Sequence, residues 1–338
     1  MLHLFASLVA VSTAILIFAG GLVTSTGSGL SVPDWPTTYG WNMFTFPLDK
    51  WVGGIFYEHS HRLIASTVGF LIVVLAIWLR RAEPRLWVRR LGYIALAAVI
   101  TQGILGGITV LFFLPDPISI AHAGLAQIVF CLTTTIALVT SRGWKTAYAA
   151  RPLTGRVSGR EMNDLILQKV AAITTGVIYA QIIVGATMRH TDAGLAIPDF
   201  PWVFGGLVPP VWNAQIAIHY AHRVGALIVS GLIIATAGHV FYHHARRGAL
   251  VRPSILLLVL LVLQITLGAI TVLGGKPFVI NSLHVVTGAL VLATSLVLTL
   301  RAYRPRFGPG SDPIHESTQG LDTGRHWGLT PGAPGTSA

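Results

Sequence analysis

Four histidines have a type and spacing that could bind a metal centre. His61 and His122 lie in the first half of the chain, and His222 and His284 lie at matching places in the second half. Each stands near one end of a long apolar segment, where a polar side chain is costly and tends to be functional. A packing or hydrogen-bonding role would explain one such residue alone, but two matched pairs favour ligation.

The available donors favour heme over other metal centres. Zinc takes four protein ligands, or three and a water, and neither half repeats a third ligand. The single cysteine, Cys131, lies inside an apolar run, so an intrachain disulfide and a cysteine cluster are excluded. Heme needs one or two axial ligands and an apolar slot, which the interior of a helix bundle supplies. The two histidine pairs therefore predict two heme pockets.

Charged residues accompany these histidines. Arg62 and Arg223 each follow a candidate ligand, where a guanidinium could pair with heme propionates or could reach the membrane interface. Glu58 precedes His61 by three residues and shares its helix face, whereas the second half has His219 at this place. A carboxylate here could accept a proton or stabilise a developing positive charge; a solvated interfacial glutamate is the alternative. This asymmetry suggests one reactive pocket and one pocket that holds a cofactor.

The elements that must hold these residues are membrane helices. The chain has 338 residues, of which 53% are hydrophobic and 10% are charged, and its mean hydropathy is +0.69. Soluble domains carry about 25% charged residues, so the composition disfavours a water-soluble enzyme. A membrane-spanning helix needs about 20 mostly apolar residues. We predict eight, at residues 4–24, 63–79, 91–114, 118–140, 170–188, 217–241, 253–274 and 278–300.

The basic residues predict the orientation of these helices. The formal net charge is +11, and most of the 23 Lys and Arg residues lie in loops on one side of the membrane. The exceptions are Lys50, Arg62, Arg189, Arg223 and Lys276. Because basic loops stay in the cytoplasm, we predict a multi-pass protein of the cell (plasma or inner) membrane with both termini cytoplasmic. The histidine pockets then lie toward the outer face, and no nucleic-acid partner is expected.

The chain repeats itself at an offset of 161 to 165 residues. Each half has an outer loop, GLSVPDWP or GLAIPDFP, then a His-Arg pair, a span with Gln and Gly, and a final histidine. The loops alone could match because Pro and Asp form turns in any protein. Four spans in each half insert in the same orientation. The fold class is therefore an all-α polytopic membrane protein of two tandem four-helix bundles, related by a pseudo-twofold axis.

This repeat divides the chain into four parts. Residues 1–141 are the N-terminal half, 142–165 a cytoplasmic linker, and 166–304 the C-terminal half, while the Gly- and Pro-rich tail 305–338 is predicted to be disordered. Gln102 and Gln264 occupy matching spans and are expected to bond across helices. His239, His243 and His244 lie at a cytoplasmic helix end, far from the predicted pockets, and we interpret them as interfacial.

This pattern resembles the heme A synthase family, the bacterial proteins related to mitochondrial COX15. The resemblance covers residues 1 to 304 and rests on the two outer loops and on Glu58-x-x-His61-Arg62, His122, His222-Arg223 and His284. It implies an oxidoreductase that oxidises a methyl group of heme O to a formyl group through hydroxylated intermediates. The product, heme A, serves terminal oxidases.

The resemblance also implies roles and partners. It makes His61 and His122 the residues that flank the substrate, heme O, and makes His222 and His284 the axial ligands of a heme b; Glu58 is the catalytic residue. A heme O synthase acts upstream, and a terminal oxidase or its assembly factors act downstream. The electron acceptor is not identified, although a quinone is one candidate. Some members carry a cysteine pair in an outer loop that this chain lacks, so a mechanism requiring that disulfide is in doubt here.

Three other functions compete with this interpretation. A diheme b-type membrane cytochrome that only transfers electrons explains the paired histidines, but it gives no reason for a carboxylate in only one half. A heme or small-molecule transporter would favour polar groups throughout the membrane depth. Heme O synthase itself is disfavoured because prenyl transfer needs acidic magnesium sites, and the spans offer no paired acidic motif.

Overall fold

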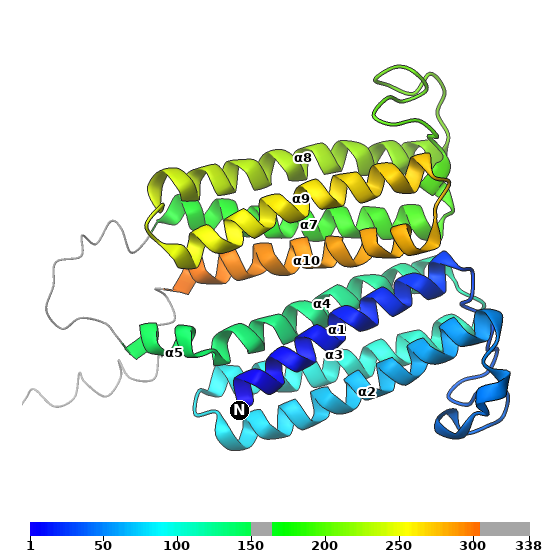
Figure 1. The fold of residues 1–338 in the computed structure, drawn as a ribbon, viewed down its shortest axis with the longest axis horizontal. Helices are drawn as coiled ribbons and strands as arrows, with labels where there is room; N and C mark the ends of the chain where they lie inside the picture. The colour runs from blue at the N-terminus through cyan, green and yellow to red at the C-terminus, as the bar shows by residue number, and fades with distance from the viewer. Residues whose placement is uncertain (150–163, 305–338) are drawn as a thin grey trace, which may run out of the picture.

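The computed structural model describes residues 1–149 and 164–304, which are helical and contain no β-strand (Figure 1). The helices are α1 (Leu2–Ser25), α2 (Gly53–Ala82), α3 (Leu86–Leu111), α4 (Asp116–Thr140), α5 (Arg142–Ala149), α7 (Leu165–His190), α8 (Ala214–His243), α9 (Gly248–Leu273) and α10 (Phe278–Tyr303). Short 3-10 helices lie in the loops, at Met43–Thr45, Leu48–Lys50 and Ala193–Leu195. The predicted disordered tail and residues 150–163 of the predicted linker lie outside the described residues.

Eight of these helices, all except α5, are long and apolar enough to cross a membrane. A helix suits this environment because it satisfies every backbone N–H and C=O within one segment. The predicted spans are confirmed within a few residues, except that α2 begins at Gly53, ten residues before the predicted start. Its first turns contain Glu58, His59 and Arg62, which are polar but buried against the preceding loop. Hydropathy alone cannot identify such turns as helical.

The long helices form two groups of four (Figure 1). In one group α1 to α4, coloured blue to green, pack against one another, and in the other α7 to α10, coloured green to orange, do the same. Most of the contacts between the groups are made by α1, α4, α7 and α10. The two groups of helices share one long interface.

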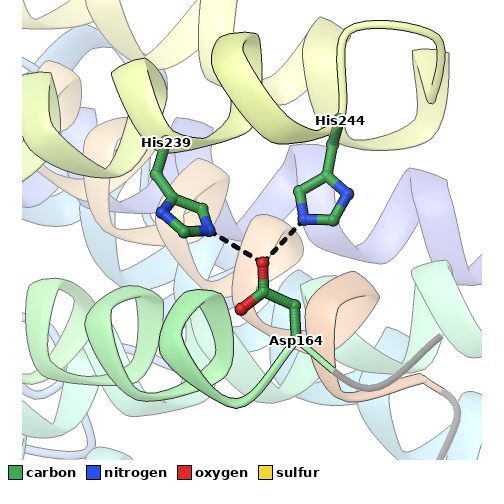
Figure 2. A group of neighbouring side chains, drawn as sticks. All are labelled: Asp164, His239 and His244. Carbon is green, nitrogen blue, oxygen red and sulfur yellow. Dashed lines mark hydrogen bonds and ion pairs between the residues drawn. The ribbon is translucent and has the colours of Figure 1, made fainter. Parts of the chain in front are cut away.

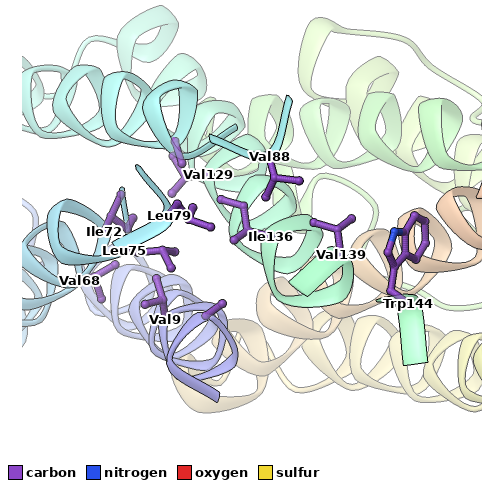
Figure 3. Packing of buried hydrophobic residues seen from close by; sticks show 12 residues of the cluster. Val9, Val68, Ile72, Leu75, Leu79, Val88, Val129, Ile136, Val139 and Trp144 are labelled. Carbon is purple, nitrogen blue, oxygen red and sulfur yellow. The ribbon is translucent and has the colours of Figure 1, made fainter. Parts of the chain in front are cut away.

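Aliphatic side chains fill the core of the first group (Figure 3). Val9, Val68, Ile72, Leu75, Leu79, Val88, Val129, Ile136, Val139 and Trp144 are among its buried members. Lipid tails are as apolar as these side chains, so the packing stabilises the fold through close contact rather than through removal from water. The indole of Trp144 joins this cluster from α5 and fixes that short helix to the group.

A polar network connects the two groups. Arg189 of α7 donates hydrogen bonds to the backbone oxygen of Gly21 at 2.6 Å and to Oγ of Ser25 at 2.7 Å, both in α1. The hydroxyls of Ser25 and Ser282 lie 3.0 Å apart, which adds α10 to the network. A Cβ atom at Gly21 would lie 3.2 Å from Cβ of Ser282, so the absence of a side chain allows this approach.

An arginine completes the hydrogen-bond ladder of α9. Pro253 lies inside that helix and has no N–H to donate to the backbone oxygen four residues earlier, which belongs to Ala249. Nη1 of Arg301, in α10, donates to this oxygen at 2.6 Å. The guanidinium therefore replaces the missing N–H and ties the beginning of α9 to the end of α10.

Loss of the Arg301 guanidinium should lower the stability of the protein only while Pro253 is present. Arg301→Ala leaves the Ala249 oxygen without its donor and should lower the stability by about 1 kcal/mol. In a Pro253→Ala background the new N–H restores the ladder, so the cost of Arg301→Ala should fall. Thermal unfolding of the four proteins in detergent measures the coupling. An equal cost in both backgrounds would contradict this assignment.

Candidate functional site

Each of the four predicted histidines faces a glycine on a neighbouring helix. His61, His122, His222 and His284 lie against Gly20, Gly106, Gly185 and Gly268, in that order. These glycines belong to α1, α3, α7 and α9. A Cβ atom at any of them would lie only 2.9–3.1 Å from Cε1 of the facing imidazole. Each imidazole therefore occupies space that is free only because the facing residue, a glycine, has no side chain.

The second-half pair has hydrogen-bond partners for its ring nitrogens. The ring centroids of His222 and His284 lie 6.4 Å apart. Nδ1 of His284 donates to the backbone oxygen of Gln264 at 3.1 Å, so its Nε2 carries a lone pair, and the side-chain amide of Gln264 lies 3.3 Å from that nitrogen. The side-chain amide of Gln181 lies 3.0 Å from Nδ1 of His222 and also donates to the backbone oxygen of that residue at 2.7 Å.

The imidazoles of the first-half pair have fewer hydrogen-bond partners. Gln102 donates to the backbone oxygen of His122 at 3.0 Å, and its amide lies 3.3 Å from Nε2 of that ring. Nδ1 of His61 and Nδ1 of His122 are buried without a hydrogen-bond partner among the described residues. The two histidine pairs thus share their glycine contacts but differ in the hydrogen bonding of the imidazoles.

These donors fit a heme centre. Metal–imidazole bonds are about 2 Å long, so two imidazoles on opposite sides of one metal have ring centres roughly 6 Å apart. The separation of 6.4 Å between His222 and His284 agrees with this value. In the first half, unpartnered buried ring nitrogens are unusual unless a bound group or water completes the site. Imidazoles between apolar helices suit heme better than a hydrated cation.

The glutamine partners follow a pattern that the sequence analysis recognised only in part. The predicted bonds of Gln102 and Gln264 across helices are confirmed. Gln181 was missed, although it precedes Gly185 by four residues, as the other glutamines precede Gly106 and Gly268. A search for Gln-x-x-x-Gly would have found it. The corresponding residue before Gly20 is Leu16, so His61 alone lacks a glutamine at this place.

Glu58 lies buried on α2 and is held through both carboxylate oxygens. Its side chain is 4% exposed, and Nη2 of Arg62 donates to Oε1 at 2.6 Å. The backbone N–H of Val32 donates to Oε2 at 2.8 Å. The alternative of a solvated interfacial glutamate is therefore wrong, because the carboxylate is paired inside the protein.

Arg62 and Arg223 hold the loops that precede their helices. Arg62 also donates to the backbone oxygens of Val32, Asp34 and Thr37 at 2.7–3.0 Å. Arg223 donates to the matching oxygens of the second loop, in Ile197, Asp199 and Trp202, at 2.7–3.0 Å. Both guanidiniums thus contact protein carbonyls, and the predicted contacts with heme propionates stay predictions.

The two loops differ where Glu58 is replaced by His219. Nδ1 of His219 accepts a hydrogen bond from the backbone N–H of Ile197 at 3.2 Å, the N–H that corresponds to Val32. The histidine therefore satisfies the same loop contact without a negative charge. A carboxylate is not required for holding this loop, which leaves its charge in the first half to be explained.

The aspartates of the two PDWP-like motifs are turn residues. Asp34 accepts from the backbone N–H groups of Tyr39 and Gly40, and Asp199 accepts from those of Phe204 and Gly205. Partial burial opposes ionisation of Asp34, but the hydrogen bonds from Gly40, Thr37 and Tyr39 outweigh it and hold its pKa below the usual value. These carboxylates stabilise the turns of the two outer loops.

His59 is a buried polar residue that the sequence analysis missed. Its imidazole is fully buried, with Nδ1 3.1 Å from Oγ1 of Thr38 and its ring packed against Phe46 and Trp51. It packs the first loop onto α2 and extends the set of residues that enclose Glu58. The second half has Tyr220 at the matching place, so the repeat carried no signal for it.

Comparison with known proteins confirms the resemblance. The chain is 26% identical to the heme A synthase of Halalkalibacterium halodurans over 87% of this chain and 94% of that protein. It is 28% identical to the heme A synthase of Geobacillus kaustophilus over 93% of this chain and 95% of that protein. It is also 31% identical to the heme A synthase of Shouchella clausii over 65% of this chain and 69% of that protein.

The family assignment rests on a match that includes all eight long helices. A family model described as cytochrome oxidase assembly protein matches residues 3–296, from the second residue of α1 into α10. The chain therefore belongs to the COX15-CtaA family of cytochrome oxidase assembly proteins.

Proposed function

We propose that this protein is a heme A synthase, which oxidises a methyl group of heme O to a formyl group through hydroxylated intermediates. Relatives that carry this name support the proposal. The observation that carries it is an asymmetry: both halves set a histidine pair against glycines, but only the first buries a carboxylate, Glu58, one helical turn from a pair member. This combination fits one resident heme and one substrate heme.

The second-half pair is the proposed site of a resident heme b, with His222 and His284 as axial ligands. The support is the separation of the two rings and the hydrogen bond that Nδ1 of His284 donates to the Gln264 backbone oxygen. Such a hydrogen bond fixes the orientation of a ligating imidazole and raises metal affinity. The bound heme supplies one-electron transfer.

The first-half pair is the proposed site of the substrate, heme O, between His61 and His122. Neither Nδ1 has a partner among the described residues, and Leu16 takes the place of a glutamine near His61. Without those hydrogen bonds an imidazole is less firmly oriented and binds a metal less tightly. Weaker ligation suits a heme that must leave after reaction.

Glu58 is the proposed catalytic residue. Oxidation of the methyl carbon draws electrons away from it, so positive charge develops there and protons leave. Arg62 and the Val32 N–H fix the carboxylate beforehand, so no reorganisation is needed when that charge appears. In a buried site the carboxylate can stabilise the charge strongly and accept a proton.

We further propose how the protein lies in the cell membrane. Residues 1–141 and 166–304 are tandem halves related by a pseudo-twofold axis, with linker 142–165 and both termini in the cytoplasm and the heme pockets toward the outer face. The distribution of basic residues supports this orientation. A heme O synthase supplies the substrate, a terminal oxidase or its assembly factors receive the product, and the electrons pass to an acceptor such as a quinone.

The reaction is tested by chromatography of hemes extracted from cells that make this protein together with a heme O synthase. Heme A should appear, and it should be absent from cells with the synthase alone. If folded, heme-loaded protein yields only hemes B and O in a host in which a known heme A synthase does produce heme A, the electron-transferring diheme cytochrome is the better assignment.

Removal of the charge of Glu58 should stop the reaction without emptying the pockets. Glu58→Gln keeps the size of the side chain and an oxygen acceptor, so we expect near-normal heme content and a loss of product of roughly 100-fold or more. The same chromatography and a heme assay of the purified protein measure both quantities.

Glu83→Gln is the matched control, because Glu83, the residue that follows the opposite end of α2, is also a buried carboxylate paired with cations, Arg85 and Lys145. It should not change the product formed per bound heme. Equal losses of heme and product in Glu58→Gln would instead assign Glu58 to holding the loop, and normal product would refute its catalytic role.

The glycine contacts can be tested on α7. Gly185→Ala places a methyl group 2.9 Å from Cε1 of His222 and should weaken the low-spin b-type absorption spectrum, which His222→Ala should abolish. Gly176→Ala is the control, because a Cβ there has no atom within 4 Å and should leave the spectrum unchanged. A normal spectrum in Gly185→Ala and His222→Ala would refute the second-half ligation.

A further inference from the structure

Two histidines predicted to be interfacial meet an aspartate at the other end of the second group of helices. Figure 2 shows His239 and His244, from α8, directed at Asp164 at the beginning of α7. Nε2 of His239 lies 2.7 Å and Nε2 of His244 lies 2.8 Å from Oδ2 of Asp164. The three potential ligand atoms all lie within 4.8 Å of one another.

Local structure fixes each member of this cluster. Asp164 caps α7, because its Oδ1 accepts a hydrogen bond from the backbone N–H of Leu167 at 2.9 Å. Its other oxygen is therefore directed toward α8. His244 is the residue after the last turn of α8 and its side chain is 7% exposed, whereas those of His239 and Asp164 are 19% and 20% exposed. The cluster is shielded but open to water on one side.

The charge around Asp164 is unusual for this end of the protein. Most arginines of the chain belong to these loops and helix ends, yet the ion pairs described for Asp164 are with the two imidazoles. Burial opposes its ionisation, but hydrogen bonds from His239, Leu167 and His244 hold the pKa of Asp164 well below its usual value. One carboxylate oxygen and two imidazole nitrogens can supply three ligands to one metal ion.

We propose that Asp164, His239 and His244 bind a divalent transition-metal ion of the zinc class. Two imidazole nitrogens and one carboxylate oxygen, with water in the remaining position, form a known type of site for such ions. Calcium and magnesium prefer oxygen ligands alone, so two imidazoles disfavour them.

The ion would join the start of α7 to the end of α8 and thereby clamp the second group of helices. His239 follows His222 by 17 residues on α8, or about 25 Å of helix. The site is therefore separate from the proposed heme pockets, and it does not depend on the proposed function.

The test uses the full, heme-loaded protein in detergent, with any histidine tag removed. After treatment with a chelator and re-equilibration with zinc, elemental analysis should find zinc bound in proportion to the chain. Loss of an outer-shell partner costs roughly 10- to 100-fold in metal affinity, so His244→Ala, which removes a ligand, should lower zinc affinity by at least roughly tenfold. Asp164→Asn should lower the zinc affinity to a similar extent, although asparagine can still cap α7.

His243→Ala is the control variant, because the ring of His243 packs 4.5 Å from that of His239 but is not one of the three ligands. It should keep the zinc. All variants should elute at the volume of the unaltered protein in size-exclusion chromatography in detergent, which shows that they fold. X-ray absorption at the zinc edge of the unaltered protein should show imidazole together with oxygen ligands. No bound zinc, an all-oxygen shell, or equal zinc affinity in His244→Ala and Asp164→Asn would overturn the proposal.

Discussion

The structure depends on how closely neighbouring helices can approach one another in the membrane. Apolar side chains gain little by exchanging lipid for another apolar surface, so helices associate where small residues permit close contact. At four such places a glycine of one helix faces an imidazole of the next. The same contact therefore brings two helices together and fixes a histidine against rigid backbone. Helix packing and the positions of the candidate ligands therefore depend on the same four glycines. A side chain at any of these glycines would disturb both.

The outer loops add chemistry to this shared scaffold. Arg62 and Arg223 hold their loops through matching backbone oxygens, and either Glu58 or His219 completes the contact. A histidine suffices for that contact in the second half. The carboxylate in the first half makes the same contact and, in addition, carries a negative charge. The two outer loops are thus held alike but differ by one charge at this place. The Asp164 cluster lies about 25 Å away along α8, at the opposite end of the same helices.

A large part of the fold was predictable, because membrane helices leave a strong local signal. Runs of about 20 apolar residues identify the spans without reference to their neighbours. The early start of α2 could not be predicted in this way. Its first turns carry Glu58, His59 and Arg62, which become compatible with a helix only because the loop provides their hydrogen-bond partners and covers them.

The sequence by itself determined the eight helices, the duplicated pattern and the four histidines at matching places, since hydropathy and repeat spacing are properties of the chain read in order. Only the tertiary structure decided which residues meet. Gln181 reaches His222 across two helices, and Asp164 meets His239, which lies 75 residues away in the chain. Such contacts depend on how one helix is rotated and placed against another. The pattern of polar and apolar residues along a single helix does not specify that arrangement, because in lipid both the packed side and the lipid-facing side of these helices are largely apolar.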